Sequence, residues 1–320
     1  MLVTGGCGFI GSNFINYWLS NHPDDSIVNL DKMTYAADEN YIDKSMVKGN
    51  FEFVKGDIAD RNTVLLLAKN AEVVVNFAAE SHVDRSITDP SPFIKSNNVG
   101  VFNLLEASRK YELRFHQIST DEVFGSLPIE SVEKFDEDSS YNPRNPYSAT
   151  KAAADLLARS YYNTYGMKVT ISNCSNNFGP HQHPEKLIPK TILHALSGKK
   201  IPIYGNGDQV RDWIYVEDHI RGVEAVLKNG KFGETYLFSS ENEISNLKMV
   251  KKLLKSVGKD ESLIEFVADR PGHDVRYALD PSKARKTLGW NSVFKFDDAL
   301  KSTVEHYVKL KELYQKKMVD

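Results

Sequence analysis

A tyrosine and a lysine spaced four residues apart could carry acid–base chemistry in this chain. Tyr147 and Lys151 fall on one face of a predicted helix that continues to residue 157. Free tyrosine has a pKa of about 10, so a tyrosine base at neutral pH needs roughly 4 kcal/mol of stabilisation of its phenolate. An ammonium about 4 Å away supplies an interaction of that order. The pair therefore indicates a lysine-assisted base, although the same spacing also occurs at ordinary helix starts.

A hydroxyl and two acids follow the predicted strand over residues 114–118. Thr120, Asp121 and Glu122 come at its carboxyl end, where α/β proteins with parallel sheets bind their ligands. Such a triplet can supply a substrate hydrogen bond, a general acid and a general base. The alternative is an acidic turn or helix cap. Its place at a strand end, a short distance before the tyrosine, favours a catalytic interpretation.

Three glycines follow the short predicted strand over residues 2–4 and open a helix. Gly5, Gly8 and Gly11 have the spacing that lets backbone N–H groups approach a pyrophosphate. Asp31 ends the next predicted strand, where a carboxylate accepts the ribose hydroxyls and disfavours a 2′-phosphate. Lys32 could soften that repulsion, but NAD rather than NADP is the simpler expectation.

These residues need an α/β framework to bring them together. Predicted strands alternate with segments of helical spacing as far as about residue 174, which indicates a Rossmann-type doubly wound parallel sheet. Loops rich in Gly, Pro and His then alternate with helices near 216–228 and 296–315. We predict an NAD-binding unit over 1–175 and a smaller C-terminal substrate-binding lobe over 176–320, around a shared cleft and with the chain free to cross between them. The predicted strands are 27–30, 51–55, 73–77, 114–118 and 168–172.

The composition limits the partners and the compartment. A content of 41% hydrophobic and 26% charged residues excludes a disordered or fibrous chain, and a net charge of -3 leaves no basic field for nucleic acid. Two cysteines, Cys7 and Cys174, are too few for a disulfide framework, so we expect a cytoplasmic protein. We expect no membrane span and no secretion signal. His181 and His183 lack the spacing of a metal site, and no metal is predicted.

Together, the glycine loop, the acid after the second strand, the threonine and the tyrosine–lysine pair resemble the extended short-chain dehydrogenase/reductases. Further segments resemble the dTDP-glucose 4,6-dehydratases within that group, and the likeness runs from residue 1 to about 290. The Thr-Asp-Glu triplet discriminates best, because relatives that only epimerise or reduce usually lack the acid pair. The segments are 78–86, 119–125, 175–180, 184–189 and 269–273.

The resemblance implies a lyase that converts dTDP-glucose to dTDP-4-keto-6-deoxyglucose and water. Tyr147 would take the proton of the sugar 4-hydroxyl, held by Thr120, while carbon 4 gives a hydride to NAD. Glu122 would then remove the proton on carbon 5, and Asp121 would protonate the departing 6-hydroxyl. The hydride would return to carbon 6. Alternatives are a UDP-glucose 4,6-dehydratase, a nucleotide-sugar 4-epimerase and a non-catalytic NAD-binding protein.

The same resemblance implies the binding residues and a homodimer, in which the helix around Phe102 and the helix of Tyr147 pair across a two-fold axis. The implied NAD contacts are Gly5, Gly8, Phe9, Ile10, Gly11, Asp31, Lys32, Met33, Thr34, Asp57, Ile58, Phe77, Ala78, Ala79, Ser81, Ser96, Tyr147, Lys151 and Asn177. The implied nucleotide-sugar contacts are Ser81, Thr120, Asn176, Lys186, Leu187, Pro202, Ile203, Tyr204, Arg211, Asn246, Asp269, Arg270, Pro271, Gly272 and His273. The two arginines and the histidine suit a diphosphate, because guanidinium groups match phosphate oxygens.

Overall fold

The main sheet of the protein consists of parallel strands that place the predicted ligand sites at one edge. The computed structural model describes residues 1–45 and 49–318; residues 46–48 and 319–320 of the two predicted units lie outside the described part. Within it, seven strands pair in the order β10-β6-β5-β4-β1-β2-β3. They are β1 (Leu2–Thr4), β2 (Ile27–Asp31), β3 (Phe51–Lys55), β4 (Val73–Asn76), β5 (Arg114–Thr120), β6 (Val169–Cys174) and β10 (Thr235–Phe238). The predicted doubly wound sheet is confirmed.

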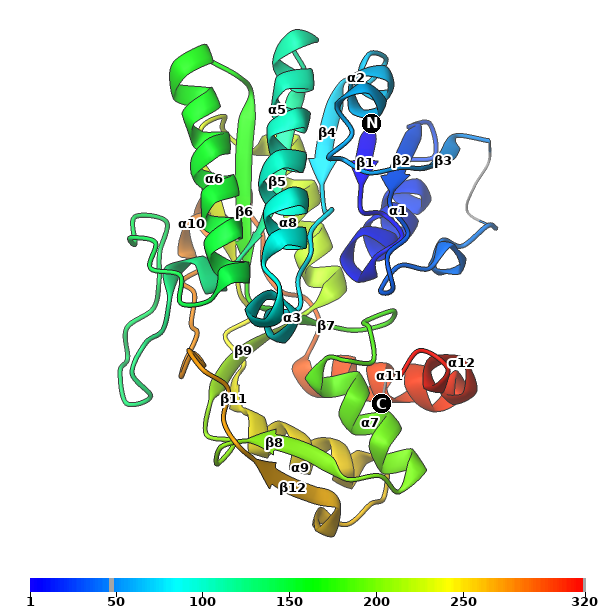
Figure 1. Cartoon of the computed structure of the whole chain (residues 1–320), viewed down its shortest axis with the longest axis vertical. Helices are drawn as coiled ribbons and strands as arrows, with labels where there is room; N and C mark the ends of the chain where they lie inside the picture. The colour runs from blue at the N-terminus through cyan, green and yellow to red at the C-terminus, as the bar shows by residue number, and fades with distance from the viewer. Residues whose placement is uncertain (46–48, 319–320) are drawn as a thin grey trace.

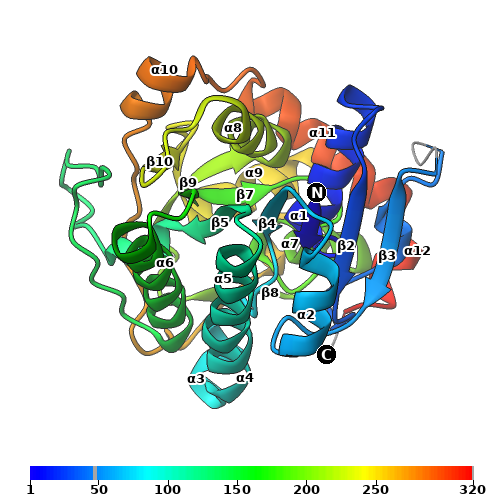
Figure 2. The ribbon, with the colours of Figure 1, turned by 90° about the horizontal axis from the view of Figure 1, so that it is seen from above.

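Helices cover both faces of this sheet (Figures 1 and 2). Leu104 and Ala158 are among the apolar side chains that pack on one face, and Phe14 and Val223 are among those that pack on the other. Burial of these amphipathic faces against the strands supplies the main stabilisation of the layers. The first face carries α2 (Arg61–Ala68), α5 (Val101–Lys110) and α6 (Pro146–Tyr165), and the second carries α1 (Phe9–Asn21) and α8 (Val216–Asn229).

The strand order sets the position of the binding crevice. The chain runs outward from β1 to β2 and β3, and then returns to the opposite side of β1 as β4. Ligands of such sheets bind at this reversal, beyond the carboxyl ends of the two central strands. Residues after β1 and β4 are the glycine loop and the segment that begins at Phe77, so both face the crevice.

A second lobe lies below the carboxyl edge of the main sheet in Figure 1. A core that includes Ile192, Met249 and Tyr307 holds its helices together. Its strands are β7 (Asn176–Phe178), β8 (Ile201–Tyr204), β9 (Val210–Tyr215), β11 (Glu243–Ser245) and β12 (Ile264–Val267). Its helices are α7 (Leu187–Ser197), α9 (Asn246–Ser256), α11 (Phe296–Lys309) and α12 (Lys311–Gln315).

The remaining elements connect the two parts. Residues 216–238 return to the main sheet as α8 and β10, and α10 (Ser282–Leu288) packs beside them, so the chain crosses between the lobes after residue 175. The division into 1–175 and 176–320 stays a prediction. Short helices α3 (Val83–Thr88) and α4 (Ser91–Phe93) and a π-helical segment, Ile94–Gly100, lead from β4 into α5. The described residues also form 3-10 turns at Glu39–Tyr41, Asp121–Phe124 and Glu261–Leu263.

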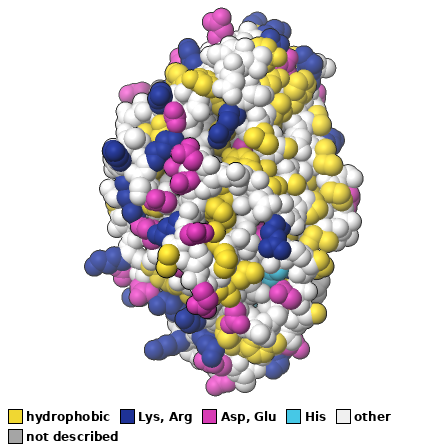
Figure 3. All heavy atoms as spheres, turned by 90° about the vertical axis from the view of Figure 1, so that its left-hand side faces the viewer, with side chains coloured by type: hydrophobic (Ala, Val, Ile, Leu, Met, Phe, Trp, Pro, Cys, Tyr) yellow, Lys and Arg dark blue, Asp and Glu magenta, His cyan; other side chains and the backbone are white. Residues whose placement is uncertain are grey.

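The helices, the metal-binding side-chain types and the surface charge are relevant to the expected absence of a membrane, a metal and a nucleic-acid partner. Among the described residues, no helix is long and apolar enough to cross a membrane. No group of three or more His, Cys, Asp and Glu side chains in residues 1–45 and 49–318 is arranged to hold a metal ion. On the face shown in Figure 3, Lys and Arg side chains lie among Asp and Glu side chains rather than forming a continuous basic surface.

Candidate active site

Two adjoining cavities occupy the carboxyl edge of the main sheet. One of about 310 Å³ lies over β1, β2 and β4, and the other of about 430 Å³ lies between the sheet and the second lobe. Six residues line both cavities, so the two cavities form one continuous cleft. The shared residues are Glu122, Asn176, Asn177, Gln182, His183 and Lys186.

The structure places most residues of the two predicted sets along the matching cavity. All the predicted NAD contacts except Met33 line the first cavity. Met33 has a positive φ of 59°, and its backbone N–H donates to Asp31, so this residue serves the turn rather than the cavity wall. Of the predicted substrate contacts, Ser81 and Thr120 line the first cavity, whereas Asp269 and Pro271 line neither. The other eleven line the second cavity: Asn176, Lys186, Leu187, Pro202, Ile203, Tyr204, Arg211, Asn246, Arg270, Gly272 and His273.

The glycine loop fits a dinucleotide because it leaves no room for side chains on its inner side. A Cβ on Gly11 would lie 2.3 Å from the carbonyl oxygen of Gly5, so helix α1 packs directly on the turn. Gly8 precedes α1 and has no side chain to cap it, which leaves the first N–H groups of the helix available. Such a helix start is a natural binding site for a phosphate. The loop therefore fits the pyrophosphate of NAD.

Asp31 is held in place to meet a ribose. Its two carboxylate oxygens accept hydrogen bonds from the backbone N–H groups of Cys7, at 2.9 Å, and Met33, at 2.8 Å. Burial raises the pKa of Asp31, and these two bonds counteract part of that shift. Each oxygen keeps a further lone pair for a hydroxyl. Lys32 pairs with Asp57 at 3.0 Å, so its charge is engaged by a carboxylate rather than reserved for a 2′-phosphate, which favours NAD.

Replacing Gly5 by alanine should destabilise the protein more than the same change at Gly198. Both glycines have similar φ values, 71° and 67°, but a Cβ on Gly5 would lie 2.5 Å from the backbone N of Ala78, whereas at Gly198 it would meet nothing within 4 Å. We expect a loss of about 1 kcal/mol in the free energy of unfolding for Gly198→Ala from backbone strain alone. Gly5→Ala adds a clash and should lose about 3 kcal/mol. Denaturant unfolding measures both; equal losses would show that the close approach to Ala78 is unimportant.

Strand β5 and helix α6 bring the predicted catalytic residues together. Thr120 is the last residue of β5, two residues beyond the predicted strand end, and its Oγ1 donates to Asp121 at 3.1 Å while accepting from the backbone N–H of Glu122 at 3.3 Å. Asn145, which caps the start of α6, donates to Glu122 at 3.4 Å. The cap that starts the helix of Tyr147 thus also orients the second acid.

The two neighbouring acids lie in a strongly desolvated environment. Burial, followed by the nearby charge of Glu122, raises the pKa of Asp121 well above its ordinary value. Burial also raises the pKa of Glu122, where Lys186 and the bond from Asn145 oppose the shift. Asp121 is 2% exposed, and its Oδ2 has no hydrogen-bond partner within the described part of the chain. Asp121 is therefore the better proton donor of the pair, and Glu122 the better acceptor.

Burial dominates the electrostatics of the tyrosine–lysine pair. Burial, reinforced by the charge of Glu122, raises the pKa of Tyr147 well above 10, although a hydrogen bond with Thr120 opposes the shift. The Nζ of Lys151 donates to the carbonyl oxygen of Ile118 at 2.6 Å, and burial lowers its own pKa. The role of Lys151 in assisting Tyr147 as a base stays a prediction.

A buried acid that the sequence analysis did not identify lies one helical turn beyond the lysine. Asp155 accepts from the hydroxyl of Ser119 at 2.5 Å and from that of Tyr141 at 3.2 Å. Burial raises the pKa of Asp155 to about 6, and Lys151 opposes the shift. Its i+4 spacing from Lys151 was visible in the sequence, but its burial, which raises the pKa, depends on tertiary packing.

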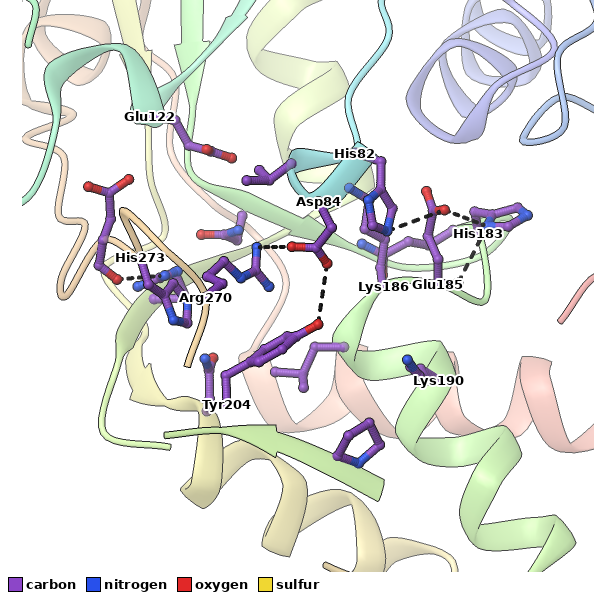
Figure 4. A pocket seen from close by; sticks show the side chains of 18 of the residues that line it. His82, Asp84, Glu122, His183, Glu185, Lys186, Lys190, Tyr204, Arg270 and His273 are labelled. Atoms are coloured by element: carbon purple, nitrogen blue, oxygen red, sulfur yellow. Dashed lines mark hydrogen bonds and ion pairs between the residues drawn. The ribbon is translucent and has the colours of Figure 1, made fainter. Parts of the chain in front are cut away.

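Basic side chains that line the second cavity lie close to carboxylates (Figure 4). Arg270 lies 3.5 Å from Asp84 and 4.6 Å from the centre of the Tyr204 ring, and the Tyr204 hydroxyl donates to Asp84 at 3.3 Å. The Nδ1 of His273 lies 2.6 Å from the Oδ1 of Asp269. Asp269 therefore contacts a residue that lines the cavity but does not line the cavity itself. The guanidinium groups here suit a diphosphate.

Other lining residues were missed because only parts of the motif segments were assigned. His82 and Asp84 belong to segment 78–86, of which only 78, 79 and 81 were given roles, and Glu185 lies in segment 184–189. His82 and His183 both face Glu185, at 3.5 and 3.7 Å (Figure 4). For His82 and Asp84, the available signal was their position beyond the carboxyl end of β4.

Comparisons with known proteins agree with this geometry. The family model described as GDP-mannose 4,6 dehydratase matches residues 2–303. The low-salt glycan biosynthesis protein Agl12 of Haloferax volcanii is 51% identical over 96% of this chain and 98% of its own, and a dTDP-glucose 4,6-dehydratase of Mycobacterium tuberculosis is 46% identical over 96% and 92%. The crystal structure of DesIV, a dTDP-glucose 4,6-dehydratase from Streptomyces venezuelae with NAD and TYD bound, is 40% identical, has a TM-score of 0.95 and is covered over 99% of both chains. The predicted resemblance is confirmed, and the chain belongs to the GDP-mannose 4,6-dehydratase family, which includes relatives named dTDP-glucose 4,6-dehydratase.

Proposed function

We propose that this protein is an NAD-dependent dTDP-glucose 4,6-dehydratase that forms dTDP-4-keto-6-deoxyglucose and water. The observation that carries this proposal is the pair Asp121 and Glu122 beside Tyr147: all three residues line the first cavity, and Glu122 also lines the second. A 4,6-dehydratase needs a base at carbon 5 and an acid at carbon 6, whereas a 4-epimerase needs no acid–base pair at these two carbons. The names of the relatives in Mycobacterium tuberculosis and Streptomyces venezuelae support dTDP-glucose as the substrate.

The proposed reaction uses each catalytic side chain for one proton. When bound in the first cavity, NAD⁺ would supply the acceptor for the hydride of carbon 4 and the source of the hydride added at carbon 6. Tyr147 takes the proton of the sugar 4-hydroxyl, which Thr120 holds by a hydrogen bond. The new keto group acidifies the proton on carbon 5, and the Glu122 carboxylate removes it. Asp121 protonates the departing 6-hydroxyl so that water leaves, and Glu122 returns its proton to carbon 5 as carbon 6 is reduced.

The pH dependence of kcat/KM should be bell-shaped and should reflect the two acids. Glu122 acts only when ionised, so activity is lost as the pH falls through its pKa, which burial raises above the ordinary value of 4.5. Asp121 acts only when protonated, and burial raises its pKa further, so activity is lost again at higher pH. Steady-state rates across a pH series test this. An acidic limb at or below 4.5, or no alkaline limb, would contradict these roles.

The substrate is tested by incubating the purified protein and NAD⁺ separately with dTDP-glucose, UDP-glucose and GDP-mannose. We expect the fastest loss of one water, detected by mass, from dTDP-glucose. Preferred dehydration of UDP-glucose or GDP-mannose would reassign the nucleotide. Formation of the 4-epimer without loss of mass would support an epimerase, and NAD binding without any turnover would support a non-catalytic protein.

The homodimer is also part of the proposal. Helix α6 and the π-helical segment before α5 expose large apolar side chains, including Leu156, Tyr165, Ile94 and Val99, and Phe102 in α5 is 38% exposed. Apolar surface of this kind is stabilised by burial against a second copy. Light scattering should give twice the chain mass, and Leu156→Asp should shift the measured mass toward that of the monomer.

Two buried thiols, Cys7 and Cys174, support a cytoplasmic location.

A further inference from the structure

The last helix of the chain is fixed to the second lobe. The Nζ of Lys311 donates to the carbonyl oxygen of Leu196 at 3.1 Å, and the Gln315 side chain donates to Ser197 at 2.6 Å. Tyr314 is fully buried, and its hydroxyl lies 2.9 Å from the Nε2 of His306. These contacts hold α12 against α7 and α11 and give residues 316–318 a defined direction.

From this base, Lys317 reaches the segment that follows β2. Its Nζ forms an ion pair with Asp38, donates to the Tyr41 hydroxyl at 2.8 Å and lies 4.3 Å from the centre of that ring. The side chains of the ion pair are only 20% and 15% exposed. Burial alone would raise the pKa of Asp38, but the bonds from Lys317 and Asn40 outweigh it and lower the pKa, so the carboxylate stays charged. The next residue, Met318, lines the second cavity.

The segment that Lys317 contacts, residues 34–41, contributes to the wall of the cofactor cavity. Thr34, Ala36 and Ala37 line that cavity beside Asp31. The backbone N–H of Asp38 donates to the carbonyl oxygen of Cys7 at 2.9 Å, inside the glycine loop. The N–H of Cys7 in turn donates to Asp31 at 2.9 Å. A short series of contacts thus joins the tail lysine to the loop and the acid that fit the pyrophosphate and ribose.

We propose that Lys317 is a positioning residue for NAD, which holds residues 34–38 against the glycine loop from the second lobe and so slows release of the cofactor. Lys317 does not line the cofactor cavity itself. An unanchored surface segment has to be ordered when a ligand binds, and that ordering lowers affinity. This inference rests on the proposed use of NAD.

The test compares Lys317→Ala with Lys316→Ala, a matched change in an exposed neighbour in the same tail. NAD⁺ titrations of cofactor-free protein should give about tenfold weaker binding for Lys317→Ala, as expected for loss of a partly buried ion pair, and no change for Lys316→Ala. Lys317→Arg should restore most of the affinity. The KM for NAD⁺ should rise more than kcat falls. Combining Lys317→Ala with Asp38→Asn should cost little more than either change alone.

Two results would overturn the proposal, and they are distinguishable from failure of the proposed function. Equal affinity in the Lys317→Ala and Lys316→Ala proteins would show that the tail does not position the cofactor. A lower unfolding temperature with unchanged NAD affinity would show that the ion pair is only structural. Both results require that the unaltered protein binds NAD⁺; a protein that binds none would overturn the proposed function as well.

Discussion

Replacing Tyr147 by phenylalanine should reduce kcat for loss of water by about a thousandfold, because the first proton then has no acceptor. The Tyr147 side chain is buried and lines the first cavity, and the backbone N–H of this residue donates to the Ser86 hydroxyl at 3.2 Å. Removal of one oxygen leaves this helix start intact. The affinity for NAD⁺ should therefore change little, and the reduced cofactor should not appear after substrate is added.

A second tyrosine on the same helix provides the control. Tyr161 is also buried, but its hydroxyl donates to Glu106 at 2.8 Å, away from both cavities. Tyr161→Phe should keep kcat within about twofold of the unaltered enzyme while perturbing α6 to a similar extent. If Tyr147→Phe retained more than about a tenth of the activity, the tyrosine would not be the base.

Exchanging the two acids for their amides should stop the reaction at different stages. Glu122→Gln removes the base, so both water loss and exchange of the carbon 5 hydrogen with deuterated solvent should fall by about a thousandfold, and reduced cofactor should accumulate. Asp121→Asn removes the acid, so water loss should fall by a similar factor while exchange at carbon 5 continues. Mass spectrometry of the recovered sugar nucleotide and the absorbance of the reduced cofactor measure these quantities.

The paired design separates the roles of adjacent side chains. Both amides keep the shape of the site, including the contact between Thr120 and residue 121 and that between Asn145 and residue 122. The opposite pattern, with exchange lost only in Asp121→Asn, would reverse the assignment. Exchange that persists in both variants would identify another base.

Local patterns in the sequence were sufficient for the cofactor loop and for six of the seven strands of the main sheet, but not for β10. The glycine spacing, the alternation of strands and the acid at the end of β2 depend on neighbours along the chain, and the structure has each of them in the predicted order. Strand ends were less accurate: β5 extends to Thr120, because pairing with β6 continues to Cys174. Such pairing is a tertiary contact that residue preferences do not encode.

Features that depend on distant contacts could not be predicted. The direction of the Tyr147 pKa shift follows from full burial beside Glu122, and the spacing of the lysine gave no measure of that burial. Likewise, Asp84 meets Arg270 across 186 positions of sequence, and Lys317 meets Asp38 across 279. Only the packing of the second lobe against the sheet brings these pairs together.

The most direct test of the proposed reaction follows deuterium placed on carbon 4 of the sugar in dTDP-glucose. The protein is incubated with this substrate and with less NAD⁺ than substrate, and the product is analysed by mass and by NMR. The proposed reaction predicts complete conversion, loss of one water and deuterium in the new methyl group at carbon 6, because the hydride is returned within the same site. Deuterium that stays on carbon 4, or that ends in an accumulating reduced cofactor, would contradict a 4,6-dehydratase.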